Sequence, residues 1–145
     1  MDDLLSLEQI YNYDEFTNQD ALEFGLCAIQ IIKQEHLKNI RIRVKHHNDI
    51  VFQFLMNGKA GEMWLDRKEN TVLKSGHSSL YVFQHQDIYQ DMIDNDEYAI
   101  CGGGFPLIEN NQVTGVFCIS GLSHEEDHDL IIRSLIMMKE KGEKL

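Results

Sequence analysis

The sequence contains little proline and cysteine, and it has no apolar stretch long enough to span a membrane. It has one proline, Pro106, and no serine-rich or glycine-rich tract, so nothing in its 145 residues has the composition of a linker. Charges interrupt every apolar stretch well before membrane-spanning length. With 43% hydrophobic residues, the chain is long enough to bury its own core. We predict one domain over residues 1–145, with residues 1–16 as an N-terminal extension.

Cysteines are few, and their pattern does not suggest disulfides. Cys27, Cys101 and Cys118 are odd in number and lack C-x-x-C spacing. Such cysteines are typical of free thiols in a reducing compartment. The first residues are acidic, whereas a secretion signal begins with basic ones. These features predict a cytoplasmic protein that is neither exported nor embedded in a membrane.

Positive charge is also scarce. The chain has 13 Lys and Arg residues against 24 Asp and Glu residues, which gives a net charge of -11. A surface of that sign repels phosphate backbones. The one basic stretch, Arg41, Arg43 and Lys45, alternates with apolar residues as the outer face of a strand would. We therefore expect no nucleic-acid partner.

Hydrophobic periodicity predicts the order of the elements. Helical spacing of apolar residues predicts helices over residues 17–36, 62–74 and 87–93 and from His124 onward. Alternating or apolar runs predict strands over residues 40–44, 51–55, 98–101, 105–109 and 113–120. Ser123 and Glu126 form a capping box at the start of the last helix. The order predicts an α+β fold, with helices on an antiparallel sheet of about five strands.

The residues from His124 to His128 match the H-E-x-x-H pattern of zinc proteases. In those enzymes two histidines one helical turn apart bind zinc, and the glutamate acts as general base. Here the helix begins at the motif itself, and Ile131 and Ser134 stand where the longer protease pattern has glycine and histidine. First-turn acids also stabilise a helix dipole, by about 0.3–1 kcal/mol each. We interpret the motif as a helix start and do not expect zinc; a hydrolase using His124 and His128 is the alternative.

Cys101 offers a second catalytic alternative. It precedes three glycines, and a fold that brought it to His128 would create a thiol nucleophile with a base. A cysteine that ends an apolar strand is more often a small core residue. We therefore assign no catalytic residue and favour a binding protein over an enzyme.

Four ordered blocks and a terminal pair carry a family resemblance. They are residues 64–70 (WLDRKEN), 76–81 (GHSSLY), 102–106 (GGGFP) and 120–122 (SGL), followed by Asp127-His128. Over about residues 17–137 the chain resembles the small uncharacterised UPF-type branch of the HbpS/GlcG-like family, whose broader relatives are called heme-binding or heme-degrading proteins. The resemblance implies a profilin-like α-β-α fold and assembly into homo-oligomers. Cys101 stands where that pattern is expected to have a histidine, so heme ligation by a histidine at this position is not available.

The matched blocks also predict a ligand site. Gly102, Gly103 and Gly104 allow positive φ and expose N–H groups, and the helix start at Ser123 adds further donors. Arg67 and Lys68 are the candidate countercharges for a small anion or carboxylate. The alternative is that the glycines only turn the chain and the cations lie on a solvated helix face.

The complete candidate site is Arg67, Lys68, Asn70, Ser78, Gly102, Gly103, Gly104, Phe105, Pro106, Ser120, Gly121, Asp127 and His128. The chain is accordingly interpreted as a homo-oligomeric small-ligand-binding or scaffolding protein. Its ligand is heme, by analogy with the family, or a small anion or carboxylate. An enzyme, either heme-degrading by the same analogy or a metal- or thiol-dependent hydrolase, is the alternative.

Overall fold

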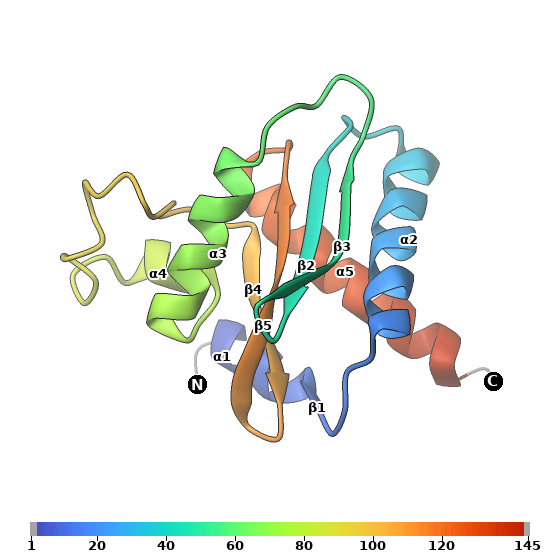
Figure 1. Ribbon diagram of the computed structural model, residues 1–145, viewed down its shortest axis with the longest axis horizontal. Helices are drawn as coiled ribbons and strands as arrows, with labels where there is room; N and C mark the ends of the chain where they lie inside the picture. The colour runs from blue at the N-terminus through green and yellow to red at the C-terminus, as the bar shows by residue number, and fades with distance from the viewer. Residues whose placement is uncertain (1–2, 144–145) are drawn as a thin grey trace.

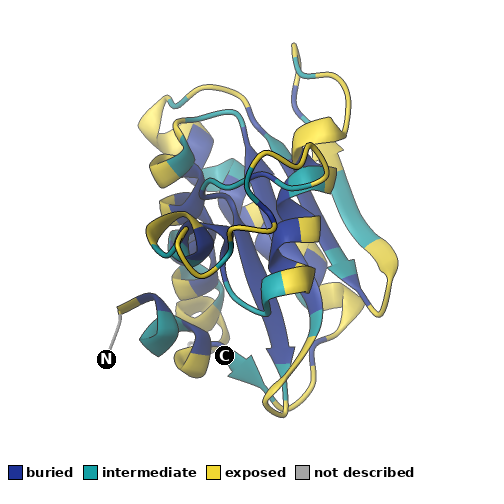
Figure 2. Ribbon diagram, turned by 90° about the vertical axis from the view of Figure 1, so that its left-hand side faces the viewer, coloured by how far each residue is buried: buried dark blue, intermediate teal, exposed yellow. Residues whose placement is uncertain are grey.

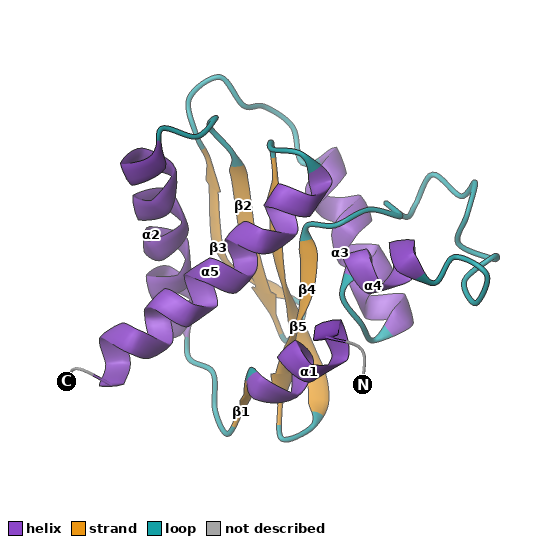
Figure 3. Ribbon diagram, turned by 180° about the vertical axis from the view of Figure 1, so that it is seen from behind, coloured by secondary structure: helices purple, strands orange, loops and turns teal. Residues whose placement is uncertain are grey.

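The protein is a three-layer α-β-α domain, as the family resemblance implied. The computed structural model describes residues 3–143. Its elements are α1 Asp3–Ile10, β1 Asn12–Tyr13, α2 Asn18–Glu35, β2 Arg41–His46, β3 Asp49–Leu55, α3 Met63–Ser75, α4 Ser79–Gln84, β4 Gly104–Glu109, β5 Gln112–Ser120 and α5 His124–Glu143. Helices α3 and α4 cover one face of the sheet, and α2 and α5 cover the other (Figures 1 and 3). Within the described part of the chain, no helix is both long and apolar enough to cross a bilayer.

The sheet has five strands in the order β1-β4-β5-β2-β3. The strands predicted over residues 40–44 and 51–55 form the hairpin β2–β3, those predicted over 105–109 and 113–120 form the hairpin β4–β5, and β2 joins the two hairpins by pairing antiparallel with β5. The fifth strand is not residues 98–101 but β1, which pairs parallel with β4. Part of the predicted N-terminal extension therefore belongs to the sheet.

Two predicted elements do not form. Residues 98–101 pair with no strand, because the Ala99 N–H instead bonds the carbonyl of Arg67 in α3 at 3.2 Å. Residues 87–93 form successive turns with i→i+3 bonds, such as Met92 N–H to Tyr89 O at 3.0 Å. Both segments have the right apolar composition but make local turn or loop contacts in place of a regular ladder.

The main apolar core lies between the sheet and the α2–α5 layer. Its largest fully buried side chains include Phe24 from α2, Phe105 and Phe117 from the sheet, and Leu135 from α5. Figure 2 shows the central strands buried while the helices expose their outer surfaces. Burial of each such side chain contributes about 1.5–3 kcal/mol, so this layer supplies most of the stability.

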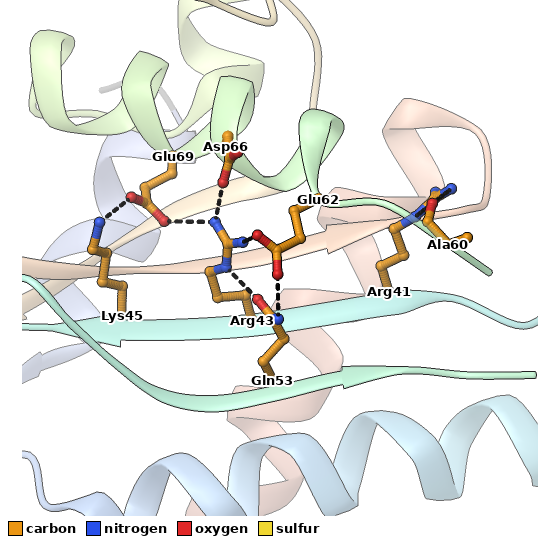
Figure 4. A network of polar contacts seen from close by, with 8 residues as sticks. All are labelled: Arg41, Arg43, Lys45, Gln53, Ala60, Glu62, Asp66 and Glu69. Carbon is orange, nitrogen blue, oxygen red and sulfur yellow. Dashed lines mark hydrogen bonds and ion pairs between the residues drawn. The ribbon is translucent and has the colours of Figure 1, made fainter.

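The opposite face of β2 carries the alternating cations, and it is covered rather than solvated. Arg43 is only 2% exposed. Its guanidinium donates to Asp66 at 2.6 Å and to Glu69 at 3.2 Å, both on α3 (Figure 4). Glu69 also accepts from Lys45 at 2.7 Å. The prediction of an outer strand face was therefore wrong for Arg43 and Lys45, because acids of α3 neutralise these two cations and attach the helix to the sheet.

Candidate functional site

The three glycines after Cys101 lie between α3, α4 and the start of α5. Two of their N–H groups are already used: Gly102 donates to Nδ1 of His124 at 3.0 Å, and Gly104 donates to Oγ of Ser79 at 2.9 Å. The carbonyl of Gly103 accepts from Ile119 N–H at 2.8 Å. The segment is thus fastened to its neighbours instead of presenting a row of free donors.

The anion that this corner attracts is supplied by the chain itself. One carboxylate oxygen of Asp127 accepts from Leu122 N–H at 2.9 Å, and the other accepts from Lys68 Nζ at 3.0 Å. Lys68 also donates to the carbonyl of Ile119 at 2.9 Å. Burial raises the pKa of Asp127, and Lys68 with the N–H groups of Leu122 and Gly121 offsets part of that rise. Asp127 and Lys68 are each 2% exposed, so they form a buried ion pair that joins α5 to α3.

Gly103 makes room for this pair. Its φ is +121°, and an added Cβ would lie 2.5 Å from the Ile119 carbonyl oxygen and against Nζ of Lys68. Real side chains do not reach such distances, so Gly103 permits the close approach as well as the turn.

A cavity of about 290 Å³ lies beside the ion pair. It is lined by Arg41, Trp64, Lys68, Cys101, Ser120, Gly121, Leu122, His124 and Asp127. We call it the Arg41 cavity. Four of the predicted ligand residues line it, namely Lys68, Ser120, Gly121 and Asp127.

Arg41 is the cation of this cavity that has no acidic partner. Its Nε and Nη2 both donate to the carbonyl of Ala60, at 3.2 and 2.9 Å, and it forms no ion pair with any residue of the 3–143 segment. A guanidinium has five N–H donors, so most of them remain for a ligand. The Ala60 carbonyl fixes the orientation of the group without reducing its charge.

His124 contributes a second donor. Because the Gly102 N–H can only donate, Nδ1 of His124 must accept, and the neutral ring then carries its proton on Nε2. The ring also contacts Phe83, at 4.7 Å between centroids. His124 therefore lines the cavity as a ring whose Nδ1 is already used, and its Nε2 lies 3.9 Å from a carboxylate oxygen of Glu125.

Arg67 and Asn70 lie on a different cavity, of about 690 Å³, whose other lining residues are Glu62, Met63, Asp66, Asp96 and Glu97. Arg67 donates to the carbonyl of Tyr98 at 3.0 Å and lies over the Trp64 ring at 4.7 Å. Asn70 donates to the carbonyl of Glu97 at 3.0 Å. Both residues thus hold the segment after residue 94 against α3.

The remaining predicted residues are buried. Ser78 is the N-cap of α4 and accepts from Tyr81 N–H at 3.2 Å, while Phe105 and Pro106 lie inside β4. His128 is 6% exposed, and its ring meets that of Phe105 at 6.1 Å. Burial lowers the pKa of His128 to about 4, and its Nδ1 has no hydrogen-bond partner among the described residues. Arg67 and His128 therefore line no common cavity.

Sequence reasoning did not assign Arg41, Trp64 or His124 to this cavity. Trp64 belongs to one of the blocks that carry the family resemblance, and His124 belongs to the H-E-x-x-H motif. Both residues were therefore noticed in the sequence but were not assigned to a ligand site. Arg41 was treated as one of three equivalent strand cations. Its position at the first residue of β2, beyond the acids of α3 that neutralise Arg43 and Lys45, distinguishes it.

Comparisons with known proteins assign the chain to a family. Residues 16–135 match the family described as haem degrading protein HbpS-like. The chain belongs to the HbpS-like family. A UPF0303 protein of Psychromonas ingrahamii is 33% identical over 93% of this chain and 90% of its own length. The crystal structure of the Ybr137w protein of Saccharomyces cerevisiae matches with a TM-score of 0.85 and 27% identity, covering 97% of this chain and 87% of that chain.

The family description and one solved structure raise the question of heme. A PduOC:heme complex has a TM-score of 0.67 and 16% identity, covering 83% of this chain and 93% of that chain, a likeness that shows the fold alone. Heme iron needs an open axial ligand such as histidine or thiolate. In the Arg41 cavity the neutral His124 is protonated on Nε2, and burial raises the pKa of Cys101, with Lys68 opposing it. The volume of about 290 Å³ is also at the lower limit of small-molecule sites, roughly 300–1,000 Å³. These residues do not fit heme at this place.

Proposed function

We propose that this HbpS-like protein binds a small carboxylate, or an anion of similar size, in the Arg41 cavity. The observation that carries the proposal is the guanidinium of Arg41. Arg41 lines a cavity, its guanidinium is oriented by a neutral carbonyl, and among residues 3–143 it has no acidic partner, although the chain has 24 acids and 13 cations. Charges arranged this way are typical of sites that receive their counterion from outside.

The rest of the lining supports a small, flat anion. A carboxylate can accept two parallel N–H bonds from one guanidinium, and His124 and Ser120, two residues whose side chains can donate hydrogen bonds, line the same cavity. Trp64 provides an apolar wall. Lys68 and Asp127 compensate each other, so the charge available to a ligand comes from Arg41.

Binding without bond-making is the activity that this arrangement favours. His128, the base of the thiol alternative, is buried and lines no part of the cavity, and the raised pKa of Cys101 keeps its sulfur in the poorly nucleophilic thiol form near neutral pH. No step is therefore assigned to either residue, and no step is assigned to heme.

The direct test is calorimetric titration with oxalate, acetate and inorganic phosphate at constant ionic strength. We expect at least one of these anions to bind the wild-type protein. Arg41→Gln should weaken that binding by about 10–100-fold, because hydrogen bonds to a charged group contribute roughly 1.5–3 kcal/mol. Lys33→Gln, which removes the same charge from an exposed position on α2, should bind as the wild type does. The proposal fails if none of the three anions binds, or if both variants bind equally.

We also propose that the protein is a homo-oligomer in the cytoplasm. Strand β3 is an edge of the sheet and exposes Ile50 and Phe54, at 50% and 44%. Edge strands with exposed apolar side chains are ready to pair with a second copy. Light scattering should find an assembly for the wild type and for Ile88→Lys, and monomers for the double variant Ile50→Lys with Phe54→Lys. A monomeric wild type would contradict the proposed assembly.

The proposed location in the cytoplasm is supported by the cysteines, because Cys27, Cys101 and Cys118 are free thiols in the structure.

A further inference from the structure

A second group of ligand-forming side chains lies at the opposite end of β2 from Arg41. It consists of His46 at the end of β2, His47 in the β2–β3 turn, and Glu109 at the end of β4. One ligand atom from each residue lies within 4.8 Å of the other two. We propose that these three residues bind a divalent transition-metal ion of the zinc class. This site is separate from the Arg41 cavity and independent of its ligand.

Two of the three separations between ligand atoms are within an ångström of those in a coordination sphere, and the third, between the two histidines, is at most 4.8 Å. Oε1 of Glu109 lies 2.5 Å from Nε2 of His46 and 3.8 Å from Nε2 of His47. With zinc–ligand bonds of about 2.0–2.1 Å in a tetrahedron, neighbouring ligand atoms are separated by roughly 3.3–3.4 Å. To bind the ion, the Glu109–His46 separation must lengthen and the Glu109–His47 separation must shorten, each by less than an ångström. Small side-chain rotations are sufficient for this.

The turn conformation places His47 over its neighbour. His47 and Asn48 both have positive φ, +50° and +67°, as in a two-residue type I′ hairpin turn. This conformation brings the two imidazoles together, with ring centroids 4.1 Å apart. Adjacent residues of a regular strand would point to opposite faces, so the turn is what allows both histidines to serve one ion.

Glu109 is held in place by groups that do not belong to the ligand set. Its Oε2 accepts from Phe16 N–H at 2.8 Å, and its Oε1 accepts from the hydroxyl of Thr114 at 2.6 Å. Phe16 also contacts the His46 ring edge-on at 5.7 Å. Such outer contacts orient metal ligands and limit the reorganisation needed for binding.

The donor set selects the kind of ion. Two imidazole nitrogens with one carboxylate oxygen suit zinc and neighbouring transition metals, whereas calcium and magnesium prefer oxygen ligands alone. The side chain of His47 is 68% exposed, so the remaining coordination position faces solvent and is open to water. His46 and Glu109 are largely enclosed, with side chains 10% and 12% exposed.

The test is zinc titration of protein carrying no histidine tag, followed by calorimetry. His47→Asn removes the exposed ligand but keeps a residue that tolerates positive φ. His36→Asn is the matched control, because His36 is also exposed and has φ +55°. We expect one zinc per chain for the wild type and for His36→Asn. Loss of a ligand should weaken binding by more than about 100-fold in His47→Asn, since changes outside the ligand set already cost 10–100-fold.

Two further measurements separate a metal site from a structural hydrogen-bond cluster. Cobalt substituted for zinc should give the visible spectrum of a low-symmetry four- or five-coordinate site in the wild type only. Thr114→Val, which removes a hydroxyl that holds Glu109, should weaken zinc binding by about 10–100-fold while Arg41→Gln leaves it unchanged. Substoichiometric zinc in the wild type, or equal affinity in His47→Asn and His36→Asn, would overturn the proposal and leave a histidine–glutamate strut.

Discussion

The buried pair of Lys68 and Asp127 gives the sharpest prediction about how the corner beside the Arg41 cavity is held together. Asp127→Asn keeps an acceptor for the Leu122 N–H but removes the negative charge that faces Lys68 at 3.0 Å. Lys68 is 2% exposed and cannot turn to water without opening the junction of α3 and α5. Breaking such a buried pair costs about 3–5 kcal/mol. This is a large share of the 5–15 kcal/mol typical of a domain.

The double variant Lys68→Met with Asp127→Asn should recover most of the loss. It removes both charges together, so no uncompensated ion remains, and the main cost left is the Lys68–Ile119 hydrogen bond of about 1 kcal/mol. Lys68→Met alone should cost about 1–3 kcal/mol, because Asp127, whose pKa burial already raises, can take up a proton. We therefore expect a coupling energy of at least about 2 kcal/mol between the two positions.

Urea unfolding followed through Trp64, the only tryptophan of the chain, measures these free energies. The exposed pair Lys74 and Asp91, 3.7 Å apart, is the control, and Asp91→Asn should cost at most about 1 kcal/mol. If the double variant were destabilised by the sum of the two single changes, the residues would act independently. The account of Asp127 as the internal anion of this corner would then be wrong.

Three further predictions concern residues around the same elements. The free energy of unfolding should fall by up to about 3 kcal/mol as the pH is lowered from 6.5 to 4. In that range His128 takes up a proton in the unfolded chain but not in the folded chain, where its pKa is about 4. His128→Gln should flatten this part of the profile of urea midpoint against pH. Gly103→Ala should lower the free energy of unfolding by more than about 2 kcal/mol, because its φ is positive and the new Cβ clashes with the Ile119 carbonyl. Gly58→Ala is the control and should lower it by about 1 kcal/mol, because Gly58 has φ +86° but open space around it. Equal losses would contradict the crowding at Gly103. Glu69→Gln should lower the free energy of unfolding by about 1–3 kcal/mol, because the buried carboxylate binds both Arg43 and Lys45. Glu62→Gln is the control and should lower it by less than about 1 kcal/mol, because the side chain of Glu62 is 52% exposed. The reverse order would contradict the network in Figure 4.

The parts of the fold that were predictable have local causes. The capping box of Ser123 with Glu126 marks the start of α5, helical spacing from residue 17 marks α2, whose N-cap is Thr17, and alternating residues mark the strands of both hairpins. Strand β1 was not predictable, because two residues carry no periodic signal and their pairing with β4 crosses almost a hundred positions of sequence. Residues 98–101 had a strand's composition, but the Ala99 N–H bonds the carbonyl of Arg67, a contact with α3 that the sequence did not indicate.

The candidate site shows the same division between local and distant information. The sequence indicated that the glycine segment, Lys68 and the start of α5 belong together, and the structure places them side by side. The sequence did not show that Asp127 occupies the position of the expected anion, because this depends on the contact of Asp127 with Lys68, a residue 59 positions away. The lone cation, Arg41, emerges only when the partners of Arg43 and Lys45 are known.

A crystal structure of the protein grown with oxalate tests the central claim most directly. The account predicts a carboxylate in the Arg41 cavity, with two oxygens about 2.7–3.2 Å from the guanidinium of Arg41, and Asp127 still bound to Lys68. A cavity that holds only water at saturating oxalate, with Arg41 turned toward an acid of the protein, would contradict it.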